Sequence, residues 1–206
     1  MNKELKETIL NPIFKGNPIT VLVLGICSSL AVTVELKGAF VMALSVIAVT
    51  GLSSLVLSIL RNTIPNRVRI IVQLVVVAMM VILVDQLLKA YAYGIDKQLS
   101  VYIGLIITNC IVMGRIEAFA LGNKPLPSLL DGLANGVGYG LILVVVAFFR
   151  ELFGSGTLLG FRIIPESFYA AGYVNNGLVI LPRMALILIG CIIWIQRSIQ
   201  KDLQEK

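Results

Sequence analysis

Long apolar runs decide what this chain can fold into. A helix needs about 20 apolar residues to cross the hydrocarbon core of a bilayer. The sequence has 206 residues, of which 58% are hydrophobic and only 14% charged, whereas soluble domains carry about a quarter charged residues. Six spans are expected, at about residues 18–34, 39–60, 70–93, 101–114, 129–149 and 177–195. The sequence therefore predicts one all-α polytopic transmembrane domain over residues 1–206, with no soluble enzymatic domain.

The basic residues gather at the ends of these runs, where they set membrane topology. The net charge of +6 therefore gives no reason to expect nucleic-acid binding. Six spans place both termini on one side, and the Lys and Arg excess on that side predicts that both termini are cytoplasmic.

Arg150 and Glu151 are expected to close the fifth span. A cleaved signal peptide is not expected, because mixed Lys and Glu precede the first run and further runs follow it.

Residues 18–93 and 99–198 resemble each other as two repeats. Cys27 and Cys110 open the two halves, and a Gly-Leu pair with an Arg ten residues after the Gly recurs at Gly51 and at Gly140. Three spans per repeat require the two copies to lie inverted in the bilayer. Such folds place their functional site at the midplane, where broken helices meet. Spans one and four, which are short, are the expected half-helices.

Cys27 and Cys110 are the candidate metal ligands. The chain has three cysteines and no histidine, so a metal would be bound through sulfur or oxygen. A buried membrane cysteine usually packs as a small hydrophobic residue, and that is our interpretation of Cys191, which has no repeat counterpart. Small or polar residues flank the other two thiols at equivalent repeat positions. Zinc and [2Fe–2S] sites each take four ligands, so the missing two would come from another polypeptide.

Two carboxylates are candidates for a cation pathway. Asp85 lies late in the third run, where an intramembrane acid is a functional hypothesis by default, and an ion pair with Lys89 one turn later is the alternative. Asp131 opens the fifth run, where the alternative role is an acid favoured by the helix dipole. In the same run Gly132, Gly136 and Gly140 recur every four residues, which predicts close helix packing rather than a phosphate loop.

Several stretches resemble the D-subunit family of the sodium-translocating NADH:quinone reductases, over essentially the whole chain. They are LGIC at 24–27, RNTIPNRVRIIVQ at 61–73, QLS at 98–100, NCIVMGR at 109–115 and FREL at 149–152. The related subunit of the electron-transporting Rnf complex shares the TNC and RE features but matches residues 65–73 less well.

The resemblance implies a bacterial inner-membrane subunit of a six-subunit NADH:ubiquinone oxidoreductase that exports Na⁺. It implies that Cys27 and Cys110 hold a [2Fe–2S] cluster together with two cysteines of a homologous E subunit of inverted topology. That cluster would relay electrons across the membrane, with NADH, flavins and ubiquinone bound by other subunits and no complete active site on this chain. Ser28, Ser29, Thr108 and Asn109 would be candidates to tune its potential by hydrogen bonding.

Three alternatives remain open at this point. The chain could be the equivalent Rnf subunit, a non-redox six-span transporter or ion channel, or a structural scaffold of the complex. The two cysteines discriminate between a cluster-binding subunit and a transporter, because a transporter tolerates the loss of Cys27 and a cluster-binding protein cannot. Iron analysis of the purified D–E pair separates the scaffold from the cluster-binding subunit.

Overall fold

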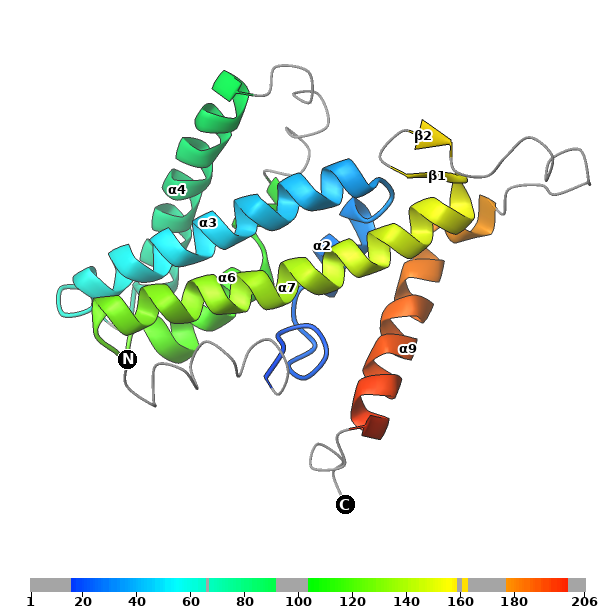
Figure 1. Ribbon diagram of the computed structural model, residues 1–206. Coiled ribbons are helices and arrows are strands. Elements are labelled where there is room, and N and C mark those ends of the chain that lie inside the picture. The colour runs from blue at the N-terminus through cyan, green and yellow to red at the C-terminus, as the bar shows by residue number, and fades with distance from the viewer. Residues whose placement is uncertain (1–15, 66, 92–103, 159–160, 163–176, 200–206) are drawn as a thin grey trace, which may run out of the picture.

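The fold of the described chain is helical, as the sequence predicts. The computed structural model describes residues 16–65, 67–91, 104–158, 161–162 and 177–199. The α-helices in these ranges are α2 (Ile26–Val32), α3 (Leu36–Leu60), α4 (Arg69–Tyr91), α6 (Cys110–Arg115), α7 (Pro125–Gly154) and α9 (Pro182–Ile199) (Figure 1). A π-helical turn, η1 (Ile116–Ala120), follows α6, and a 3₁₀ turn, η2 (Gly177–Val179), precedes α9.

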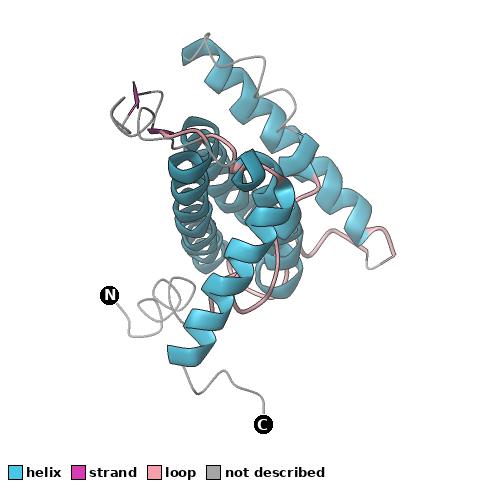
Figure 2. Ribbon diagram, turned by 90° about the vertical axis from the view of Figure 1, so that its right-hand side faces the viewer, coloured by secondary structure: helices cyan, strands magenta, loops and turns pink. Residues whose placement is uncertain are grey.

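One small antiparallel strand pair is the exception to the helical fold. β1 (Thr157–Leu158) pairs with β2 (Phe161–Arg162), with Thr157 opposite Arg162 and Leu158 opposite Phe161. The quarter-turn view shows this pair beside the helices that make up nearly all of the described chain (Figure 2).

Among the described residues, four helices are long and apolar enough to cross a membrane: α3, α4, α7 and α9. They correspond to the second, third, fifth and sixth predicted spans, but the bounds of the last two were wrong. α7 continues to Gly154 rather than ending at residue 149, and α9 continues to Ile199 rather than ending at residue 195. α7 begins at Pro125 rather than at residue 129, because proline at the first helical position needs no N–H partner. α9 begins at Pro182 rather than at Gly177, because proline disfavours helical backbone in the residue before it.

The first and fourth predicted spans are not continuous helices. Only α2, seven residues long, forms in the first, because Val23 and Gly25 just before it adopt positive φ values of 56° and 78°. In the fourth, residues 104–107 are helical, the helix is interrupted at Thr108 and Asn109, and α6 then starts at Cys110 and continues into η1. Residues 92–93 and 99–103, at the edges of the two expected repeats, lie outside the described residues.

α3 and α7 pack along their lengths as an antiparallel pair that forms the core (Figure 1). The glycine repeat of α7 permits this approach, since a Cβ on any of the three glycines would lie 2.8–3.0 Å from an atom of α3. The contacts are Gly132 with Thr50, Gly136 with Ile47, and Gly140 with Ala43. The predicted close packing is confirmed. This pair is the rigid frame on which the shorter helices are placed.

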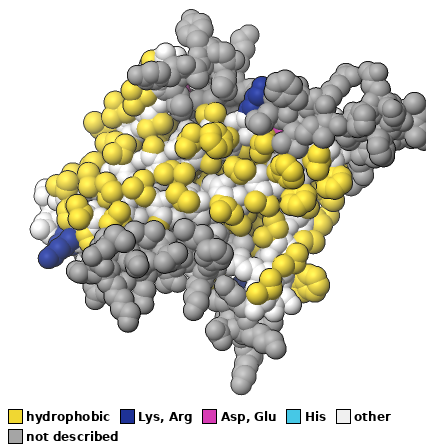
Figure 3. Space-filling view, in the orientation of Figure 1, with side chains coloured by type: hydrophobic (Ala, Val, Ile, Leu, Met, Phe, Trp, Pro, Cys, Tyr) yellow, Lys and Arg dark blue, Asp and Glu magenta, His cyan; other side chains and the backbone are white. Residues whose placement is uncertain are grey.

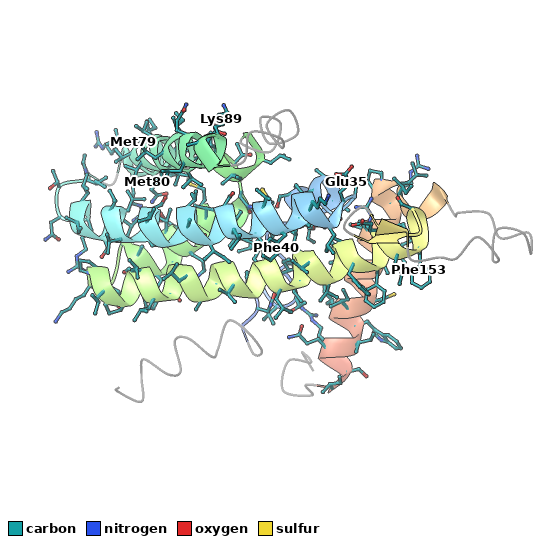
Figure 4. The ribbon with its side chains drawn as sticks, turned by 45° about the horizontal axis from the view of Figure 1, so that its top comes forward. Glu35, Phe40, Met79, Met80, Lys89 and Phe153 are labelled. Carbon is teal, nitrogen blue, oxygen red and sulfur yellow. The ribbon has the colours of Figure 1, made fainter. Side chains whose placement is uncertain are left out.

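The outer surface of the helices is apolar. Large side chains such as Ile70 (63% exposed) and Trp194 (72% exposed) cover α4 and α9, and hydrophobic side chains form broad areas of the visible face (Figure 3). α4, which carries Met79, Met80 and Lys89, lies on the far side of α3 from α7 (Figure 4). An apolar exterior of this extent is typical of chains that face lipid or partner helices.

Candidate functional site

The two candidate thiols both lie at the start of a short helix. Cys27 is the second residue of α2 and Cys110 is the first residue of α6. Both side chains are exposed at the surface of the chain. A thiol at the surface can bind a metal ion or cluster jointly with residues of another chain, whereas a thiol buried in the core cannot.

The two cysteine-bearing segments pack directly against each other. A Cβ on Gly25 would lie 2.5 Å from Cδ1 of Ile111, the residue after Cys110. A Cβ on Gly114 would lie 3.2 Å from Cδ1 of Leu24. A glycine in each segment therefore packs against an aliphatic side chain of the other segment. Segments more than 80 residues apart in the sequence are held together at their thiol-bearing ends.

A buried hydrogen-bond network joins these two segments to α7. Ser28, next to Cys27, has its Oγ 2.8 Å from the hydroxyl of Tyr139 in α7. Asn109, next to Cys110, donates from Nδ2 to the same Oγ at 3.3 Å. Asn109 also caps α6, because its Oδ1 accepts from the backbone N–H of Ile111 at 3.1 Å. Ser28, Asn109 and Tyr139 are each at least 97% buried.

Two of the four residues predicted to tune a cluster belong to this network, and two do not. Ser28 and Asn109 connect the two segments. The Ser29 hydroxyl donates to Ile26 O within its own helix, and the Thr108 hydroxyl donates to Gly104 O. Sequence reasoning missed Tyr139, which lies directly before Gly140 of the glycine repeat.

The donor set fits half of a [2Fe–2S] site. Within the described residues no group of three or more Cys, Asp or Glu side chains is placed to hold a metal ion. Two exposed thiols next to a common buried network would supply two of the four thiolates that such a cluster requires. The residues present fit the cluster only if a second chain provides the remaining ligands.

Arg150 and Glu151 do not simply close a span at the membrane surface, as the sequence suggested. Arg150 is 1% exposed and Glu151 is 6% exposed, although both lie in the last two turns of α7. Glu151 Oε2 accepts from the backbone N–H of Leu36 at 2.7 Å, at the first turn of α3. Figure 4 shows Glu35 and Phe153 at this same end of the α3–α7 pair.

The guanidinium of Arg150 binds the end of α2 and the turn before α9. Nη1 donates to Thr33 Oγ1 at 2.5 Å and to Leu30 O at 3.3 Å. Nε donates to Val179 O at 3.2 Å, and Nη2 donates to Ile180 O at 2.5 Å. Together Arg150 and Glu151 hold the chain on both sides of the break between α2 and α3. Sequence patterns do not identify these long-range partners.

Asp85 forms the ion pair that the sequence offered as its alternative role. Its Oδ2 lies 2.9 Å from Lys89 Nζ, one turn later on α4. The side chain is largely buried, and its Oδ1 has no hydrogen-bond partner within the described part of the chain. The pair leaves one carboxylate oxygen available to a further cation or donor.

Asp131 does not open its helix, because α7 begins six residues earlier. It is 3% exposed and accepts two hydrogen bonds from Arg115, at 3.0 Å from Nε and 2.5 Å from Nη2. Asn135 Nδ2 donates to the same carboxylate at 3.1 Å, and Asn135 Oδ1 is buried without a partner among the described residues. The pair with Arg115 ties the end of α6 to α7. No described interaction joins Asp131 to Asp85.

Glu117 connects η1 to α4. It forms an ion pair with Arg69 and accepts from Gln73 Nε2 at 2.7 Å. The two members of the ion pair are 38% and 41% exposed, so its position fits an interface. The helix that carries Cys110 is thus anchored to α7 through Arg115 and to α4 through Glu117.

Comparison with known proteins places this chain in one family. The family model described as "Rnf-Nqr subunit, membrane protein" matches residues 5–193. The D subunit of the Na⁺-translocating NADH-quinone reductase from Haemophilus influenzae is 56% identical over 201 residues, which cover 98% of this chain and 97% of the relative. The protein of the same name from Psychromonas ingrahamii is 54% identical, with 98% and 96% covered. The chain belongs to the Rnf-Nqr family of membrane subunits.

Proposed function

We propose that this chain is the D subunit of a Na⁺-translocating NADH:ubiquinone reductase in a bacterial inner membrane. In this role Cys27 and Cys110 supply two of the four thiolates of a [2Fe–2S] cluster, and a homologous E subunit of inverted topology supplies the other two. The observation that carries the proposal is the packing of the two thiol-bearing segments on each other and on Ser28, Asn109 and Tyr139. The full-length likeness to named D subunits supports the choice of complex.

When bound, the cluster supplies one-electron transfer between the cytoplasmic and the periplasmic side of a six-subunit complex. The contribution of this chain is to position the two cysteine thiols and to exclude water from them. α2 and α6 present their thiols at the surface, toward a partner. Buried apolar residues of α7 such as Leu143 and Val146 belong to the same core cluster as Ile111, the residue after Cys110. NADH, flavins and ubiquinone are bound by other subunits, and this chain has no complete active site of its own.

The proposal includes two inverted repeats whose half-helices are α2 and the α6–η1 segment. The contacts of Ile111 with Gly25 and of Leu24 with Gly114 support it, because the half-helices of inverted-repeat folds meet at one site. Six spans and the Lys and Arg excess on the side of the termini would place both chain termini in the cytoplasm.

Asp85 and Asp131 are proposed as points on the Na⁺ pathway. Each is a largely buried carboxylate in a helix long enough to span the membrane, and the partners observed are basic side chains that a cation could displace. Asp85→Asn should slow Na⁺ uptake into vesicles that contain the complex, while iron content stays unchanged. Unaltered Na⁺ uptake by this variant would remove Asp85 from the pathway.

Iron and acid-labile sulfide analysis of the co-purified D–E pair tests the cluster assignment. We expect two irons and two sulfides per pair, and loss of both in Cys27→Ser. Cys191→Ser is the matched control, because Cys191 is also exposed but lies on α9, outside the two segments that carry Cys27 and Cys110. An iron-free wild-type pair would favour a scaffold or a non-redox six-span transporter. NADH-dependent quinone reduction by the intact complex separates the proposal from the equivalent Rnf subunit, which the family model also covers.

A further inference from the structure

We propose that Tyr139 is a positioning residue for the thiols of Cys27 and Cys110. Its hydroxyl donates to Ser28 Oγ and so fixes how the start of α2 lies against the start of α6. The inference rests on the proposed function, since the two thiols matter jointly only if they bind one group. It adds a residue on α7, far from either cysteine in the sequence, that governs their mutual placement.

The direction of each hydrogen bond follows from the groups that surround Ser28. A hydroxyl has one proton to donate and two lone pairs to accept with. Gly25 O, 3.0 Å from Ser28 Oγ, is a carbonyl oxygen and accepts the Ser28 proton. The Asn109 amide nitrogen, 3.3 Å away, donates to one lone pair. Tyr139, at 2.8 Å, therefore donates to the other, and the hydrogen-bonding capacity of Ser28 is complete.

The ring of Tyr139 contributes as well as its hydroxyl. A Cβ on Gly25 would lie 3.2 Å from Tyr139 Cε2, so the ring edge closes the space beside the break that precedes α2. Tyr139 is fully buried, and its helix packs against α3 through the glycine repeat. A ring held in this way gives its hydroxyl a fixed position, which a side chain on a loop would not do.

Packing alone does not account for the hydroxyl group of Tyr139. Phenylalanine would occupy the same volume without burying a polar atom, and buried polar groups are costly unless they are hydrogen-bonded. The retained hydroxyl connects both cysteine segments through one atom of Ser28. Its loss would leave the helices folded but would widen the range of distances between the two thiols.

Tyr139→Phe in the intact complex is the test, read by electron paramagnetic resonance and redox titration of the [2Fe–2S] signal. We expect near-wild-type iron content, broadened resonance lines and a displaced midpoint potential. We also expect kcat to fall by about two- to tenfold, the factor that one neutral hydrogen bond represents, with the KM for NADH unchanged. A structural role alone would lower thermal stability without moving the potential.

Two neighbouring serines provide the second variant and its control. Ser28→Ala removes the acceptor of Tyr139 and should reproduce the broadened lines and the displaced potential. Ser29→Ala is matched in chemistry and burial, but Ser29 bonds only within its own helix, so its spectrum should be that of the wild type. If Tyr139→Phe does not yield an assembled complex, the spectrum of Ser28→Ala decides.

The outcomes separate the two proposals. A wild-type signal that depends on Cys27, together with unchanged spectra and potentials in Tyr139→Phe and Ser28→Ala, overturns the positioning role and leaves the proposed function intact. A wild-type complex without a Cys27-dependent signal overturns both. Complete loss of the signal from an assembled Tyr139→Phe complex supports the positioning role.

Discussion

Arg150 Nη1 lies 2.5 Å from Thr33 Oγ1, so a buried guanidinium in the last turns of α7 binds the C-terminal cap of the helix that carries Cys27. The same guanidinium donates to three backbone carbonyls, at Leu30, Val179 and Ile180. Hydrogen bonds from charged donors contribute about 1.5–3 kcal/mol each. Through these contacts of Arg150, α7 fixes the position of the C-terminal end of α2.

Arg150→Gln should therefore destabilise the chain by at least about 3 kcal/mol, because several buried acceptors lose their donor. Arg150→Lys should recover only part of the loss, since one ammonium group cannot reproduce the planar fork. Thermal unfolding of the detergent-purified complex measures both. Arg183→Gln is the control, because Arg183 is exposed at the start of α9. Equal unfolding temperatures for Arg150→Gln and Arg183→Gln would contradict the assignment.

Gly25→Ala should disrupt the contact between the two cysteine segments. Gly25 has φ 78°, which a residue with a Cβ adopts only at a cost, and the new methyl group would lie 2.5 Å from Ile111 Cδ1. We expect a loss of about 2 kcal/mol or more from strain and overpacking together, with reduced iron content. The comparison variant is Gly190→Ala in α9, where a Cβ meets nothing within 4 Å and alanine should stabilise the helix by about 1 kcal/mol. Normal iron content in Gly25→Ala would argue against a fixed crossing of the segments.

Ser28→Ala should also destabilise the chain more than Tyr139→Phe. The alanine leaves two buried donors, from Asn109 and Tyr139, without their acceptor, whereas the phenylalanine leaves only one hydroxyl lone pair unused. We expect about 1–3 kcal/mol for Ser28→Ala and clearly less for Tyr139→Phe. Chemical denaturation of the two variants, beside Ser29→Ala, provides the ranking, and the reverse order would mean that the hydrogen bonds run in other directions.

The ion pair between Arg115 and Asp131 should be strongly coupled, because the two side chains are only 19% and 5% exposed. A double-mutant cycle with Arg115→Gln and Asp131→Asn should give a coupling free energy of about 2 kcal/mol. The same cycle on Arg69 and Glu117, which are 38% and 41% exposed, should give about 0.2–1 kcal/mol. Similar couplings for the two pairs would show that burial does not set their strength.

Much of the fold follows from local pattern. Apolar runs identify α3, α4 and α7 to within a few residues, since length and composition alone define a span. The four-residue glycine spacing from Gly132 to Gly140 gives the α3–α7 packing correctly, because spacing of that kind places all three glycines on one helix face.

The rest depends on contacts that no local pattern encodes. Arg150 and Glu151 lie at the end of an apolar run, where exposed charges are common, and only their partners Thr33 and Leu36 show them to be buried. The break before α2 depends on Val23 at φ 56°, a conformation that β-branched residues rarely adopt. Tyr139 could have been noticed as a single phenol within an apolar, glycine-rich helix, but its link to Ser28 required the folded chain.

Electron paramagnetic resonance of the purified, reduced complex tests the central claim most directly, with wild type, Cys27→Ser, Cys110→Ser and Cys191→Ser compared under identical conditions. The account predicts a [2Fe–2S] signal component in the wild type and in Cys191→Ser that is absent when either Cys27 or Cys110 is replaced. An undiminished signal in Cys27→Ser and Cys110→Ser would contradict it and would place the cluster on other subunits.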